Sequence, residues 1–142
     1  MTVAEKVIVR QDSQYRLSVE AVDPQGEPDK FYPVGKLHDV TPFGMLLVSL
    51  GACTTILLHS YSRNHGLRLR EAEVRLEYLD AEGEQPEHIT AEVAVRGNLT
   101  GDEEQRLLQV SQHCAVHNLL ENGIEIQWGR LEHAPSGSKD QV

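Results

Sequence analysis

Apolar and polar residues alternate with a period of two in several stretches of the chain, a pattern typical of half-buried β-strands. The alternation is clearest in residues 15–21, 72–78 and 89–95, and it returns in residues 124–128 with Ile, Ile and Trp at every second position. Residues 3–10 are rich in β-branched side chains and predict a further strand. The period-two segments favour antiparallel pairing, because one face of each strand can then lie in the core.

Three local features qualify this pattern. The apolar phase slips near Arg70-Glu71, which predicts a bulge or bend before the strand over 72–78. The polar residues 11–14 have hairpin length and predict a tight connection between the first two strands. Residues 31–34 predict only a short edge strand, because Pro33 limits its pairing.

A long helix is predicted between the strands, over residues 42–65. Thr41 can cap its N-terminus, Pro42 suits the first turn, and Gly66 can end it in a left-handed conformation. Apolar and small residues occupy every face from Met45 to Leu58, so we expect this helix to be enclosed on all sides. Gly51 and Ala52 lie within this stretch and should let another backbone approach beside Cys53.

Polar residues make the same helix a poor membrane span. Ser49, Gly51, Thr54 and Thr55 interrupt its apolar surface. We therefore expect no membrane association through this segment.

A second helix is predicted from the capping-box spacing of Thr100 and Glu103. Leu107, Val110 and Cys114 follow at helical spacing, so Cys114 should face the core. The order of elements predicts an α+β fold with mostly antiparallel strands. We expect one domain over residues 1–133 and a flexible C-terminal tail over residues 134–142.

Composition narrows the function classes. The 142 residues carry a formal net charge of −9, which makes nucleic acid or an anionic membrane surface a poor partner. The N-terminus has no long apolar stretch typical of a signal peptide, so a cytoplasmic location is expected. Thiols stay reduced there, and a disulfide would be redox-active rather than structural.

The chain has two cysteines, Cys53 and Cys114, one on each predicted helix. The simpler interpretation is that both are small buried hydrophobic residues, since free cysteine is among the most buried residue types. The functional interpretation requires the two thiols to meet, and spacing alone does not decide between these alternatives.

The motifs around these cysteines resemble the OsmC/Ohr family, which comprises proteins related to osmotically induced protein C and to organic hydroperoxide resistance protein. The resemblance runs from about Arg16 to Trp128. It rests on Thr41-Pro42, a Met-Leu-Leu run, Ser-Leu-Gly-Ala-Cys-Thr at Cys53, His-Cys-Ala-Val-His at Cys114, and Gly-Ile-Glu-Ile after the second helix.

The resemblance implies a fold, a reaction and partners. The fold would be an intertwined homodimer in which strands of both chains wrap two central helices. Cys53 would attack an organic hydroperoxide and become a sulfenic acid, and Cys114 would then condense with it to form a disulfide. An external dithiol, typically lipoyl-bound, would restore both thiols. The reaction would need no bound cofactor. A cation must favour the thiolate, and Arg16 is the candidate, with Arg10 as second choice.

The same resemblance places the substrate pocket beside Cys53. We expect it to be lined by residues of the central helix, namely Phe43, Met45, Leu46, Ser49 and Leu50.

Two positions depart from the family pattern. Competent members carry a glutamate that orients the arginine, whereas this chain has Phe43 and Gly44 at the two positions where it occurs. Asp39 or Glu20 could substitute for it. Ala115 stands where many members have proline. The alternative function is therefore a catalytically weakened relative that binds a small ligand or senses redox state.

The histidines suggest another alternative. His113, Cys114 and His117 have metal-ligand spacing, and His59 or Cys53 could complete a site. Sites with soft ligands usually show denser clusters, so we expect no metal. His59 lies about 240° round the helix from Cys53, a poor position for a general base.

Overall fold

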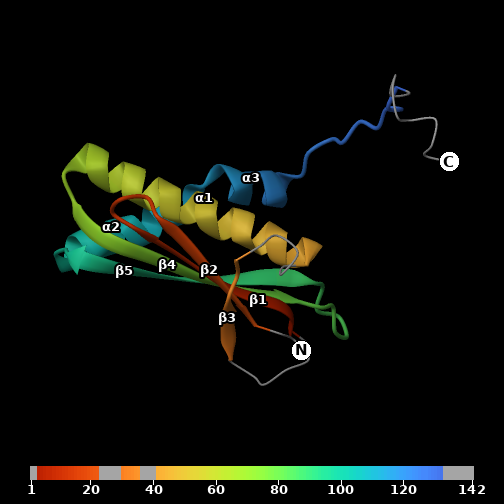
Figure 1. Ribbon diagram of the computed structural model, residues 1–142, viewed down its shortest axis with the longest axis horizontal. Coiled ribbons are helices and arrows are strands. Elements are labelled where there is room, and N and C mark those ends of the chain that lie inside the picture. Colours follow the sequence, from red (N-terminus) through yellow and green to blue (C-terminus); the bar gives the residue numbers. More distant parts are fainter. Residues whose placement is uncertain (1–2, 23–29, 36–40, 133–142) are drawn as a thin grey trace.

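Five antiparallel strands form one sheet in the order β3-β2-β1-β4-β5 (Figure 1). The computed structural model describes residues 3–22, 30–35 and 41–132; the expected tail and Asp39 lie outside them. The elements, in chain order, are β1 Val3–Asp12, β2 Leu17–Val22, β3 Phe31–Pro33, α1 Pro42–His65, β4 Arg68–Leu79, β5 His88–Asn98, α2 Gly101–Val110, a 3-10 turn Ser111–His113, and α3 Ala115–Asn122.

The register of the sheet places its apolar residues on the face that carries the helices. Val9 of β1 pairs with Val19 of β2 on one side and with Val74 of β4 on the other. Val9 and Val74 are buried and Val19 is partly buried, which confirms the strands predicted over residues 3–10, 15–21 and 72–78. The pairing of β4 with β5 shifts register between Leu69 and Glu71, which confirms the predicted bulge.

Helix α1 lies across this face of the sheet (Figure 1). The Thr41 hydroxyl accepts the Gly44 N–H at 3.0 Å, and Gly66, at φ 68°, ends the helix as predicted. Gly51 faces the sheet, where a Cβ would come within 2.7 Å of a Val9 methyl group. The close neighbour is therefore a strand side chain rather than a backbone.

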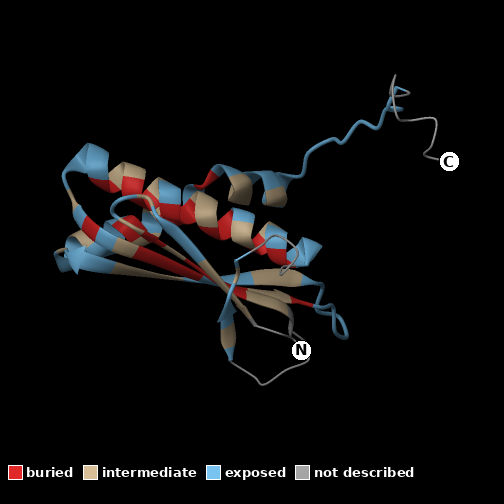
Figure 2. Ribbon diagram, viewed as in Figure 1, coloured by how far each residue is buried: buried red, intermediate tan, exposed pale blue. Residues whose placement is uncertain are grey.

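The expectation that α1 is enclosed on all sides is wrong for the single chain. Figure 2 shows buried residues along its sheet side and exposed residues along its outer side. Large apolar side chains lie exposed there: Met45 is 41% and Ile56 46% exposed. Among the described residues, the chain offers no surface that covers this side.

Among the described helices, only α1 is long and apolar enough to cross a membrane. Core helices often share that property, and the buried residues of α1 pack against β1 and β4 within the same chain.

The second predicted helix starts as expected and then breaks. Thr100 and Glu103 form both hydrogen bonds of the capping box at the start of α2. The chain leaves the helix at Ser111, makes a 3-10 turn, and begins a new helix at Ala115. α2 and α3 lie on the same side of the sheet as α1, because Leu107 packs with Leu58 and Cys114 packs with Leu47.

The predicted last strand over 124–128 is wrong for this chain. Residues 123–132 form no strand and run away from the body of the molecule (Figure 1). Ile124, Ile126, Trp128 and Leu131 are 65–93% exposed. The local alternation fits a strand, but a strand needs a partner edge, and within the chain this segment reaches none.

Candidate functional site

The fold brings Cys53 and Cys114 together. Cys53 lies midway along α1 and is half-buried, whereas Cys114 lies just before α3 and is only 2% exposed. Both are free cysteines, and Cys53 packs against the buried cluster that contains Cys114. The fold therefore brings the two cysteines into one cluster, as the functional interpretation of the pair requires.

Cys114 is the cap of α3. Its backbone is extended, with φ −75° and ψ 153°, and its Sγ accepts the N–H of His117 at 3.3 Å. The Thr54 hydroxyl lies 3.6 Å from the same sulfur and 2.9 Å from the carbonyl oxygen of Leu50. A hydroxyl has one hydrogen, so Thr54 donates to only one of them at a time and can accept from the Cys114 thiol when it donates to Leu50.

Opposing influences act on the Cys53 thiol. Burial raises its pKa above the ordinary value, and the Cys114 thiol raises it further. The backbone N–H groups of Val116 and Ala115 face the sulfur and lower its pKa in part. Burial prevails, so within the single chain Cys53 is held mainly as the neutral thiol at pH 7.

The chain does not bring Arg16 to Cys53. Arg16 is 75% exposed in the β1–β2 turn, where its Nε donates to Asp12 at 2.8 Å. That turn packs on the last turns of α1, since Tyr15 contacts His59 and Arg63. His59 follows Cys53 by six residues, which is about 9 Å along the helix. A role for Arg16 at Cys53 stays a prediction.

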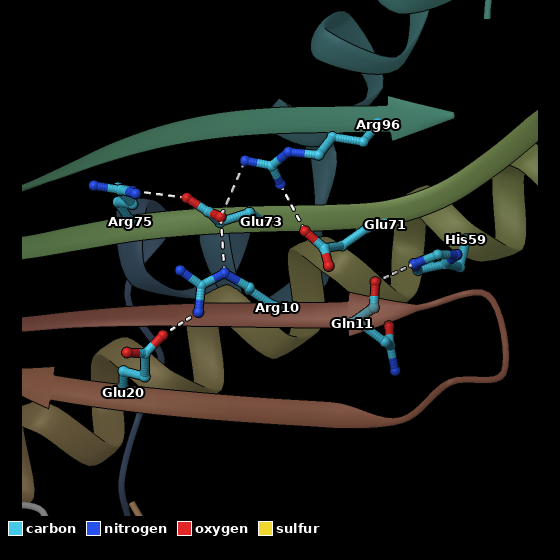
Figure 3. Close-up of polar contacts among 8 residues, drawn as sticks. All are labelled: Arg10, Gln11, Glu20, His59, Glu71, Glu73, Arg75 and Arg96. Atoms are coloured by element: carbon cyan, nitrogen blue, oxygen red, sulfur yellow. Dashed lines mark hydrogen bonds and ion pairs between the residues drawn. The ribbon is translucent and has the colours of Figure 1, made fainter. Parts of the chain in front are cut away.

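Arg10, the second choice, points to the opposite face of the sheet. It forms ion pairs with Glu73, at 2.8 Å, and with Glu20 (Figure 3). Arg75 and Arg96 also donate to Glu73, at 2.7 and 3.3 Å. Glu20, one substitute considered for the missing glutamate, is therefore engaged away from the cysteines.

A groove of about 1010 Å³ runs beside the cysteine pair. Its walls come from α1, from β4 and β5, and from α2 and α3, and its lining includes Leu50, Val74, Val93 and Thr54. Because Thr54 also contacts the Cys114 sulfur, this residue lies between the groove and that thiol. Spacing in the sequence does not point to this part for Thr54, because it depends on the packing of two helices.

The five expected pocket residues divide between two sides of α1. Leu46 and Leu50 line the groove, and Phe43 packs against Tyr78, one of its wall residues, with ring centroids 4.7 Å apart. Met45 and Ser49 lie exposed on α1 and are not part of the groove lining.

Two of the histidines considered for a metal site are engaged in hydrogen bonds. The buried His59 contacts the carbonyl oxygen of Gln11 through Nε2, at 2.8 Å (Figure 3). His117 contacts the carbonyl oxygen of Gln112 at 2.7 Å and Glu121 at 2.8 Å. In the described part of the chain, no three His, Cys, Asp or Glu side chains cluster so that they could hold a metal ion.

Comparisons with known proteins agree with this architecture. A family model described as OsmC-like protein matches residues 35–129. An OsmC-like hydroperoxide resistance protein from Jannaschia sp. CCS1 has a similar structure, with a TM-score of 0.58 and 12% sequence identity over 93% of this chain and 95% of that one. An OsmC-like protein from Mycoplasma pneumoniae gives a TM-score of 0.49 and 15% identity over 80% and 85%. No curated protein matches the sequence.

Proposed function

Because the chain belongs to the OsmC-like protein family, we propose that it is a cysteine-based peroxidase that reduces organic hydroperoxides. The observation that carries the proposal is that Cys53 packs against the buried cluster that contains Cys114. Two free thiols in one cluster, one of them half-buried and the other enclosed, suit a cycle in which the first is oxidised and the second closes a disulfide.

The proposed reaction proceeds in two chemical steps. The Cys53 thiolate attacks one peroxide oxygen, the O–O bond breaks, and the alkoxide leaves and takes up a proton to become an alcohol. Cys53 is now a sulfenic acid. The Cys114 sulfur then attacks the Cys53 sulfur, and the hydroxyl group leaves with a proton as water, which forms the Cys53–Cys114 disulfide.

An external dithiol closes the cycle. One of its thiolates attacks the disulfide, its second thiol resolves the mixed disulfide, and both cysteines return to the reduced form. We propose a lipoyl-type dithiol for this step and no bound cofactor. A reducing compartment such as the cytoplasm would keep the resting enzyme in its dithiol form.

A homodimer is part of the proposal. The exposed apolar side of α1 and the exposed segment after α3 each lack a surface to cover them in the chain described. Soluble monomers rarely expose large contiguous apolar surface, so a second copy of this chain is the proposed cover. In such a dimer the alternating residues 124–128 could join a sheet of the partner.

Turnover with cysteine variants tests the function. The unsubstituted protein should consume cumene hydroperoxide with dihydrolipoamide as reductant. Cys53→Ser should abolish turnover, whereas Cys114→Ser should allow one oxidation per chain and leave a sulfenic acid that a sulfenic-acid-specific probe traps. Full activity in the Cys53→Ser protein would overturn the proposal.

One observation favours the second candidate, a protein that binds a small ligand or senses redox state. The groove of about 1010 Å³ has the size of a ligand site, and Phe43 packs on one of its wall residues where a charged residue is expected in competent relatives. This candidate predicts negligible turnover with every dithiol and an apolar compound that remains bound through purification. Native mass spectrometry of the purified protein would detect such a bound compound and so distinguish this candidate from the peroxidase.

A further inference from the structure

The groove beside the cysteine pair has an apolar floor. Its volume is about 1010 Å³, and Leu50, Val74 and Val93 are among the residues that line it. These three side chains belong to, or pack against, the same core cluster as Cys53 and Cys114. The inner wall of the groove is therefore continuous with the surroundings of both thiols.

Carboxylates lie at the rim of the same groove, on two different walls. Glu87 comes directly before β5, is exposed, and accepts the Tyr78 hydroxyl at 2.5 Å. Glu121 belongs to α3, is also exposed, and lies 2.8 Å from His117. Apart from His88 and His117, the described residues of the lining include no basic side chain to balance these two carboxylates.

We propose that the groove selects uncharged apolar molecules over molecules that carry a free carboxylate, and that Glu87 and Glu121 determine this specificity. In the proposed reaction the favoured substrates are alkyl, aryl or esterified lipid hydroperoxides. The inference rests on the proposed function and names the substrate class of the same site.

The chemistry of the groove favours this selection. An uncharged hydrocarbon body gains free energy when it leaves water for the apolar floor. A carboxylate on the same molecule loses hydration in the groove, finds no lysine or arginine in the described lining, and is repelled by Glu87 and Glu121. The net charge of −9 acts in the same direction. Rejection of an unwanted ligand by like charge is a common source of specificity.

The experiment compares an acid with its own methyl ester. Decanoic acid and methyl decanoate compete with the uncharged dye Nile red for the reduced full-length protein near neutral pH. The variant that combines Glu87→Gln with Glu121→Gln should bind the acid about 3- to 10-fold more tightly than the parent and bind the ester equally well. Glutamine keeps the size of each side chain, and at residue 87 it keeps an acceptor for the Tyr78 hydroxyl.

Two further variants tie the result to the groove. Glu92→Gln removes the same charge from the opposite face of β5, because Ala91 and Val93 on either side of it line the groove. It should leave the affinities for acid and ester unchanged. Ala91→Trp should fill part of the groove and weaken binding of both the dye and the ester. Thermal unfolding checks that every variant folds.

The inference would be overturned if the double glutamine variant kept the parent's ratio of acid to ester affinity, or if Ala91→Trp bound the ester as well as the parent does. Binding of these compounds requires no turnover, so the result is separate from whether the protein is a peroxidase. If linoleic acid hydroperoxide and its methyl ester are turned over, the ratio of their kcat/KM values should shift toward the acid in the double variant. Absence of turnover with both would count against the proposed function alone.

Discussion

At the scale of single residues, Glu73 shows how far burial can depart from sequence expectation. The alternation of β4 places Glu73 on the polar face of the strand, yet the residue is only 4% exposed. Burial alone would raise its pKa, but hydrogen bonds from Arg75 and Arg10 outweigh burial and lower the pKa from 4.5 to about 2. Three arginines therefore keep one enclosed carboxylate charged.

Glu73→Gln should destabilise the fold by about 1–3 kcal/mol at pH 7, because it leaves grouped arginines without their shared anion. The folded-state pKa lies below the unfolded-state value, so the stabilisation is complete above pH 4.5 and is lost as pH falls toward 2. In urea unfolding, the difference in the free energy of unfolding between the Glu73→Gln variant and the parent protein should be smaller at pH 3 than at pH 7.

The matched control is Glu92→Gln, on the same sheet face but exposed. It should change the free energy of unfolding little at either pH. A Glu73 variant as stable as the parent at pH 7 would contradict the account of this network.

The residue scale also shows what sequence can and cannot predict about the site. Both cysteines could be found from their motifs, because the pattern of residues around each is distinctive. The residues that contact each cysteine could not be predicted in this way. The contacts of Thr54 with Cys114, and the engagement of Arg16 by Asp12, depend on which helix face meets which neighbour, and one-dimensional spacing does not specify this.

At the scale of elements, the helices and most strands were predictable because local signals agree with the final packing. The caps at Thr41 and Thr100 form as their sequences indicate. The segment 124–128 carries the same kind of local signal, but its pairing partner is absent from the chain described. Local alternation therefore predicts the capacity to form a strand, and the partner decides whether one forms.

The fit of α1 on the sheet yields a prediction about Gly51. A Cβ at this position would lie 2.7 Å from Val9 Cγ2 and 3.0 Å from Leu76 Cδ1. Gly51→Ala should therefore push α1 off the sheet and cost about 1–3 kcal/mol, more than the roughly 1 kcal/mol that alanine gains in helix propensity. Thermal unfolding should show a lower midpoint.

Gly101→Ala provides the comparison for the same substitution in a helix. A Cβ there meets nothing within 4 Å, so its unfolding midpoint should stay unchanged or rise. If Gly51→Ala proved neutral or stabilising, the proposed close contact between α1 and β1 would be wrong.

At the scale of the whole molecule, the single chain leaves its two most apolar exposed surfaces uncovered. One is the outer side of α1, with Met45 and Ile56, and the other is the segment after α3, with Ile126 and Trp128. The fold class could be predicted from the order of elements, but which apolar residues the chain buries could not, because that depends on how the helices pack on the sheet; we propose that a second copy covers the rest.

The dimer is tested by solution mass. Light scattering should give twice the chain mass of 15.9 kDa. Ile56→Glu should shift the population toward monomer, because the dimer would bury an unpaired charge. Thr90→Glu, an exposed change on the opposite face of the sheet, should leave the dimer intact. A monomeric parent protein would contradict the proposed assembly.

The most direct test of the central claim is a thiol count with intact mass, before and after one equivalent of tert-butyl hydroperoxide under non-reducing conditions. The account predicts that both thiols disappear within seconds and that the mass falls by about two hydrogens, as for a Cys53–Cys114 disulfide. Two thiols that persist for many minutes at unchanged mass would contradict the peroxidase and favour the ligand-binding alternative.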